Sequence, residues 1–445
     1  LSSGSLLSII GEIESGDGWE KWSDKIKDCF DGEVLRNEVV TQFSVAIGDY
    51  SSSGGHNSTA LGAYANSGGL QSTALGSSSN ASAQGAVAIG HNSAAAGENS
   101  IAIGSYTAAT CANSFVLGAG AIANGDGAGA IGYMANTQGT DSMAIGVKAC
   151  ALNTNASAIG TNATASGVNS MAFGANSRAT GANSTAIGAQ SFADQTNSFV
   201  IGPNTTACGI NAGAIGASAN ANGTSSLAIG VQSYAKENSS LALGTNASSI
   251  GINSTAIAVN ASATGANSMA IGYFSSSNGV NSAALSVMAN ATGNNSVALG
   301  VFANAQGGNA LSFGTFSLAS GTNATAISSN SSATGDNSIA IGVDSVANKQ
   351  NAQSFGVSAT AAGINAVAIA AGSFANGRNS MAMGVLANAT ALNTAAIGTF
   401  AHATQNGALA FGANSAATAN YTMAFGVNSL ASSNNAIAIG RYANA

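Results

Sequence analysis

The chain has 445 residues, of which 6% are charged and 6% are aromatic, and it contains 58 glycines but a single proline, Pro203. The net charge of −7 includes only ten basic residues, which excludes the basic groove or surface that nucleic acid or an anionic membrane would need. The sequence has no long apolar run, no signal-like start and no lipidation motif. We therefore expect no direct membrane insertion by this segment.

Residues 1–41 differ from the rest, because they hold thirteen of the 27 charged residues and both tryptophans. Trp19, Trp22, Ile26 and Phe30 follow helix spacing, which predicts a short amphipathic helix. The open end of a solenoid leaves backbone groups unpaired, so we predict that this segment caps the first coil. The alternative is that it docks onto a partner, a neighbouring subunit or an end-to-end copy of the chain.

A five-residue phrase, first seen at residues 44–48, returns every fourteen residues up to Gly440 without insertion or deletion, which makes 29 copies. We count positions from its last residue, the anchor, which is Gly in 25 copies, so that Ile47 lies at position −1. Position −1 is always Ile, Leu, Phe or Met, and positions +3 and +5 are always Ala, Ser or Thr. A fixed period with fixed chemistry predicts an all-β, parallel β-roll solenoid of 29 coils over residues 42–445.

Each coil is predicted to contain two short strands and two turns. The first strand covers positions −4 to 0 and the second covers +2 to +6. Side-chain alternation turns the small residues at +3 and +5 inward and those at +2 and +4 toward solvent. The common Gly at +7 and Asn at +9, as in Gly181 and Asn183, predict a turn with left-handed backbone. Stacked asparagines can also hydrogen-bond to one another along the column.

The first strand has no polar side, which is typical of a strand buried on both faces. One chain covers only one of these faces, and the other would be an apolar ridge roughly 134 Å long, far larger than a soluble monomer exposes. We therefore expect copies of the chain to associate side by side. We favour the small residues lying against the second strand and the Ile column lying on the common axis, but the inverse assignment stays open. The predicted oligomer core comprises Ile47, Ile103, Ile145, Ile187, Ile229, Ile271, Ile341, Ile397 and Ile439, with Gln353 as the one amide at position −3.

Four consecutive coils carry Phe274, Met288, Phe302 and Phe316 at position +2, with Leu318 beside the last. Because neighbouring coils lie about 4.8 Å apart, these side chains predict a ridge roughly 14 Å long. A contiguous exposed apolar row often marks an interaction surface, so we predict a partner-binding patch. The alternative is that the ridge packs against a neighbouring chain or stabilises the stack through ring contacts.

Neither a catalytic constellation nor a metal or cofactor site is predicted. The histidines His56, His91 and His402 occupy different repeat positions, and no nucleophile motif or paired carboxylates occur. Cys111 and Cys150 would lie roughly 13 Å apart along the solenoid, too far for a disulfide within one chain. The sequence therefore predicts a protein that is not an enzyme.

The phrase Asn-Ser-x-Ala-Ile-Gly, complete at residues 183–188 and nearly so at 99–104, resembles the head repeat of the YadA-type trimeric autotransporter adhesins. The resemblance implies a left-handed β-roll, a homotrimer with a shared core, a location on the outer surface of a Gram-negative cell, and attachment to a host matrix or cell-surface molecule. No neck, stalk or membrane barrel follows the repeats in this sequence. The alternative function is a structural subunit of an extracellular fibre that polymerises end to end through its N-terminal segment.

Overall fold

A computed structural model describes residues 43–445 as two compact units, one ending at Ser191 and one spanning Phe192–Ala445, and each unit is described by itself. All regular elements in the described range are β-strands, from β1 (Val45–Ile47) to β57 (Ile437–Ile439). The expected helix around Trp19 and Phe30, and with it the expected cap, lies outside the described residues.

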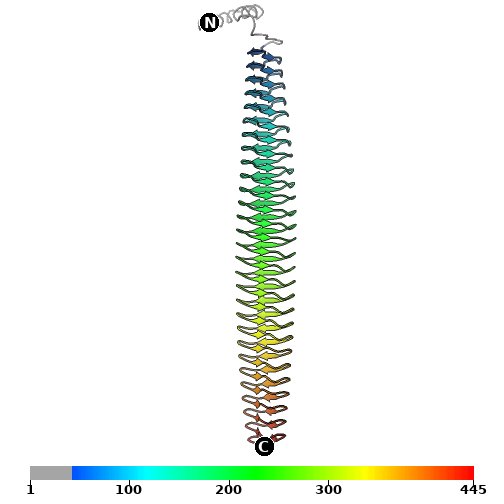
Figure 1. The fold of residues 1–445 in the computed structure, drawn as a ribbon, viewed down its shortest axis with the longest axis vertical. Helices are drawn as coiled ribbons and strands as arrows, with labels where there is room; N and C mark the ends of the chain where they lie inside the picture. Colours follow the sequence, from blue (N-terminus) through cyan, green and yellow to red (C-terminus); the bar gives the residue numbers. More distant parts are fainter. Residues whose placement is uncertain (1–42) are drawn as a thin grey trace, which may run out of the picture. The chain divides into compact units, whose positions relative to one another are not determined.

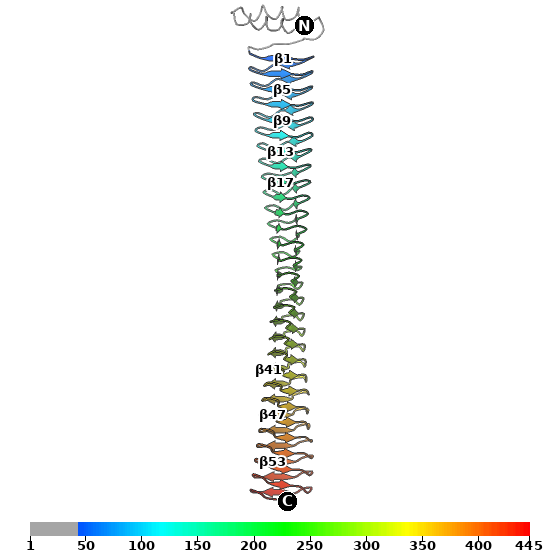
Figure 2. The same cartoon turned by 90° about the vertical axis from the view of Figure 1, so that its left-hand side faces the viewer.

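Each coil before the last has a three-residue first strand at positions −3 to −1 and a two-residue second strand at +4 and +5, such as β1 and β2 (Ser52–Ser53), and the last coil has only its first strand, β57. Within each unit, a first strand pairs in parallel with the next first strand, fourteen residues on, so that Val45 lies opposite Thr59. Second strands pair in the same way, and Ser52 lies opposite Asn66. Figures 1 and 2 show the coils stacked one upon another within each unit. The predicted parallel β-solenoid is confirmed, although its strands are shorter than predicted.

The strands are short because the backbone turns through the left-handed region twice in every coil. One turn places position +9 there, as at Asn57 with φ 55°, and this is the turn that the asparagines predicted. The other places position +2 there, as at Tyr50 with φ 54° and Phe274 with φ 53°. The prediction that position +2 lies on the outer face of the second strand was therefore wrong, because this residue belongs to the turn that joins the two strands.

The anchor is Gly because its backbone conformation excludes most side chains. Gly48 has φ 132°, and a Cβ built on it would overlap the backbone carbonyl of Gly62 in the next coil. The glycine at position +7 has another role than the one predicted. Gly55 does not have a positive φ, and a Cβ on it would overlap the carbonyl of Gly69. Close approach of successive coils, rather than left-handed backbone, therefore explains the Gly at +7.

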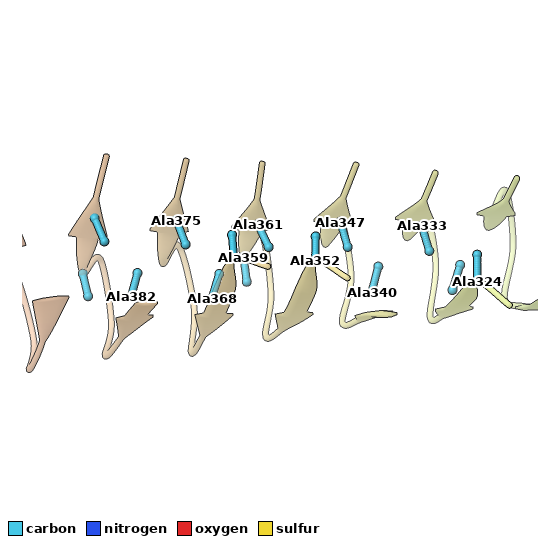
Figure 3. Close-up of a cluster of buried hydrophobic side chains, with 14 of the residues drawn as sticks. Ala324, Ala333, Ala340, Ala347, Ala352, Ala359, Ala361, Ala368, Ala375 and Ala382 are labelled. Carbon is cyan, nitrogen blue, oxygen red and sulfur yellow. The ribbon is translucent and has the colours of Figure 1, made fainter. Parts of the chain in front are cut away.

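The core between the two strand rows is thin and built from small side chains. Figure 3 shows alanines from first strands, such as Ala340 and Ala368, pointing toward alanines from second strands, such as Ala347 and Ala361. All four side chains are fully buried, and Val116 and Val200 are the largest that are fully buried in the described residues. The small residues of the first strand thus face the second strand, as we favoured, and the large residues at −3 and −1 face outward.

Because the buried side chains are small, contacts between coils depend strongly on hydrogen bonds along the stack. The Gly62 N–H donates to the Ile47 carbonyl over 2.8 Å, and the Tyr64 N–H donates to the Asp49 carbonyl over 2.7 Å. Side chains extend this ladder at position +9, as predicted. In the second unit, ten amide-to-amide bonds of 2.9–3.2 Å connect eleven asparagines, from Asn253 to Asn393.

Candidate functional site

The first-strand face, which we define as the side chains at positions −3 and −1, is a mainly apolar surface that runs along each unit. Ile47 and Ile439 are 55% and 75% exposed. The other seven isoleucines predicted for the oligomer core are half-buried, as is Gln353. All of them project from first strands on the side opposite the alanine core. The structure thus places the predicted core residues on one outward face of their own unit.

This face carries no charge, because Asp, Glu, Lys and Arg are absent from positions −3 and −1 in all 29 coils. Position −1 is filled by Ile, Leu, Phe or Met, and successive aromatic residues there stack: the rings of Phe411 and Phe425 lie 4.7 Å apart and almost parallel. At position −3, the Phe115 ring lies where a Cβ on Gly129 would be, and Phe199 covers Gly213 in the same way. Phe115 and Phe199 therefore each fill the gap left by a glycine in the next coil of their own chain.

The predicted partner patch is also exposed, but it lies on the turn at position +2 rather than on the strand. Phe274, Met288, Phe302 and Phe316 are between 38% and 57% exposed, whereas Leu318 is half-buried at the start of β40 (Leu318–Ala319). The rings of Phe302 and Phe316 are stacked, with their centroids 4.9 Å apart and an angle of 5° between the ring planes. The prediction that side chains at position +2 of neighbouring coils stack on one another is confirmed for this pair.

Sequence analysis missed the residues at position +1 that widen this ridge. Tyr273, Val287 and Val301 are 47%, 39% and 37% exposed, and the Tyr273 ring packs edge-on against Phe274 with centroids 4.5 Å apart. The sequence could have indicated these residues, because apolar residues occupy both +1 and +2 in three consecutive coils. We call these three residues, with the four at position +2, the turn ridge.

The turn ridge combines two features. Its four residues at position +2 adopt φ of 53–58°, a conformation that Asn tolerates better than Phe or Met. The ridge also lies in residues 238–335, a stretch without a single Asp, Glu, Lys or Arg. Bulky apolar side chains thus occupy a turn whose backbone geometry disfavours them. Such a conflict between local preference and observed residue is common at functional surfaces.

The thiols of the described cysteines offer no evident chemistry. Cys111, Cys150 and Cys208 are free, as predicted for the first two. Burial raises the pKa of the Cys150 thiol. Burial and the nearby Asp194 carboxylate raise the pKa of the Cys208 thiol, which lies 3.9 Å from Asp194 Oδ2. Because the thiolate is the reactive form, these shifts make both cysteines weaker nucleophiles at neutral pH.

Residues 43–445 contain no cluster of three or more His, Cys, Asp or Glu side chains that could hold a metal ion. None of the elements in that range is a helix long and apolar enough to cross a membrane. The same residues present two exposed apolar surfaces, the first-strand face and the turn ridge. The candidate functional sites are therefore surfaces for contact with other macromolecules.

The fold defines the chain as a parallel β-solenoid with fourteen residues per coil. The family model described as the YadA head domain repeat matches it at residues 42–65, 67–107, 123–149, 151–177, 179–205, 209–257, 263–285, 287–352, 375–415 and 417–443, with overlapping matches joined. These matches cover well over half of the sequence. The chain therefore belongs to the YadA head repeat family, as its repeat phrase indicated.

Among solved structures, the chain is similar to the collagen-binding domain of the Yersinia adhesin YadA, seen as a crystal structure. The two are 23% identical over 40% of this chain and 68% of that one, with a TM-score of 0.14. No curated protein sequence matches the chain.

Proposed function

We propose that this chain is the head of an extracellular surface adhesin: a rigid, non-enzymatic, left-handed β-roll that works as a side-by-side homotrimer and attaches to a host matrix or cell-surface molecule. The observation that carries the proposal is the first-strand face, which is apolar, uncharged and turned away from the core of its own chain. Membership of the YadA head repeat family supports both the assembly and the attachment.

The size of the face supports self-association. The second unit alone has eighteen first strands, from β23 (Phe199–Ile201) to β57. With strands about 4.8 Å apart and roughly 10 Å long, they present on the order of 800 Å² of mainly apolar surface. That is about the area that each partner buries in a stable protein–protein interface. A second copy of the chain fits this face, because two uncharged apolar surfaces of the same repeat meet without charge repulsion.

The test is to place one charge in the face. Ile229→Asp or Ile271→Asp would bury an unpaired carboxylate in each copy of the assembly, which is costly. We expect dissociation or a large loss of heat resistance, measured by sedimentation velocity and thermal melting. Gln232→Asp is the matched control, because Gln232 is an exposed turn residue at +2 in the same coil and Asp344 occupies this position in another coil. An Ile229→Asp protein as fully assembled and as heat-resistant as the parent would contradict this use of the face.

The second candidate function is a fibre subunit that grows end to end, with residues 1–41 as the docking segment. Electron micrographs of the purified protein separate the two functions, because an adhesin head stays a rod of one length and a fibre subunit grows into longer filaments. Removing residues 1–41 should stop filament growth if the fibre is correct, and it should cause aggregation if that segment caps the first coil. If the deletion changes neither filament growth nor aggregation, the segment neither docks subunits nor caps the first coil.

The turn ridge is the candidate site for attachment, and its support is the row of exposed apolar residues in left-handed backbone. We expect Phe302→Ser with Phe316→Ser to lower adhesion to matrix-coated surfaces or lateral bundling, with assembly and melting nearly unchanged, since Ser78 and Ser218 already occupy this position. Phe400→Ser is the control, because Phe400 also lies at +2 and its exposure, 44%, matches the 43% of Phe302. Equal losses of stability and binding would place the ridge inside the assembly.

A further inference from the structure

Gln353 interrupts the first-strand face with a polar group. It begins β45 (Gln353–Phe355) and lies between Ile339 of the preceding coil and Val367 of the following one. No hydrogen bond to its side chain is formed by the described residues. Position −3 holds a hydroxyl residue at six levels of the chain but an amide only here. The face thus carries one amide that no described residue of its own chain hydrogen-bonds, at one defined height.

A repeating apolar face does not by itself determine how two copies align. In the second unit, sliding one copy by one coil leaves seventeen of its eighteen first strands facing equivalent strands. One difference in side-chain size is evened out within the chain, because Phe199 fills the space above Gly213. An assembly held only by Ile, Leu, Phe and Met would therefore populate several registers.

We infer that Gln353 sets the axial register between copies of this chain. The inference rests on the proposed side-by-side assembly through the first-strand face. In register and with parallel chains, the Gln353 amides lie at the same height, where each N–H can donate to the carbonyl oxygen of another copy. A shift by one coil places each amide against Ile339 or Val367 of the other copy and leaves its donors and acceptor buried without partners, which is costly. A polar residue at one core position of a coiled coil specifies register in the same way.

Register also decides whether the assembly closes. Copies related by rotation alone form a closed ring, whereas an added shift at every interface produces an open, staggered assembly. Gln353 therefore favours the closed form. Replacing Gln353 by an apolar residue should preserve the association of copies through the first-strand face but allow them to shift along its axis.

The experiment uses the full chain with its four cysteines replaced by serine. Thr325→Cys and Val367→Cys each place a thiol at position −3, on coils three levels apart, and roughly 14 Å exceeds the reach of a disulfide. When the two tagged variants are co-expressed and oxidised, in-register copies form only like-to-like disulfides. Unlike disulfides join the Thr325→Cys thiol of one copy to the Val367→Cys thiol of another, are identified by mass spectrometry, and report copies displaced by three coils.

With Gln353 present, we expect almost entirely like-to-like disulfides. Gln353→Leu should raise the unlike disulfides about tenfold or more, which is what the loss of a buried unsatisfied amide from the shifted states implies. Gln306→Leu, at the exposed position +6, is the matched control and should change nothing. The inference is overturned if Gln353→Leu stays strictly in register or if it stops assembling. Absence of any disulfide, with a monomer in sedimentation, would instead contradict the proposed assembly itself.

Discussion

The anchor glycine provides the sharpest test of the coil geometry. In Gly342→Ala, the added Cβ sits on a residue with φ 133° and overlaps the backbone carbonyl of Gly356 in the next coil. Backbone in this region costs a non-glycine residue about 1–3 kcal/mol, and the neighbouring coil must also move. Three of the four anchors that are not Gly have a smaller φ, with 105° at Ala258 and Ser328 and 95° at Ala370, whereas Ser286 has 121°. We therefore expect Gly342→Ala to destabilise its coil by about 2 kcal/mol.

The assay is hydrogen exchange by mass spectrometry, because unfolding of a long repeat array is not a simple two-state process. A loss of about 2 kcal/mol should speed exchange of amides in residues 339–356 by about 30-fold if they exchange through local opening. Distant peptides of the same unit should not change.

Gly308→Ala is the matched control. Gly308 does not have a positive φ, and a Cβ on it meets no atom within 4 Å. We expect this variant to be neutral or about 0.5 kcal/mol more stable, because Ala restricts the unfolded chain. The reasoning would be refuted if both variants sped exchange equally, or if Gly342→Ala left exchange in its own coil unchanged.

Two further predictions concern single polar groups. Ser296 Oγ donates to the Gly293 carbonyl over 2.6 Å, whereas the buried Ser338 Oγ at the same repeat position has no partner among the described residues. Ser296→Ala should therefore destabilise its coil by about 1 kcal/mol, and Ser338→Ala should be neutral or stabilising. Hydrogen exchange of each coil is the measurement. Asp194→Asn removes a charge that raises the pKa of the Cys208 thiol, so alkylation of Cys208 by iodoacetamide at pH 8 should become about threefold faster. The rate at Cys150, whose thiol pKa is raised by burial alone, is the internal control, and an unchanged rate at Cys208 would contradict the effect of the carboxylate.

Much of the architecture could be predicted from sequence because the repeat reports the same environment 29 times. Small residues at +3 and +5 predicted a thin core, and Ala163 and Ala165 are fully buried in it. The asparagines at +9 predicted both a left-handed turn and an amide ladder, and both are present at Asn267. The absence of a polar side on the first strand predicted an apolar face that its own chain leaves uncovered.

The limits of strands and turns depended on the tertiary structure. Position +2 accepts Asn, Ser, Tyr and Phe, so its variability indicated exposure but not that its backbone is left-handed. The Gly at +7 suggested the same backbone as Asn at +9, yet only the stacked coils reveal that Gly55 is small because the Gly69 carbonyl approaches it. Spacing between coils is a property of the stack, and no local preference of the chain encodes it. The sequence by itself therefore determined the repeat, the buried residues and the outward apolar face, and the stacked structure decided where each coil turns and why its glycines are required.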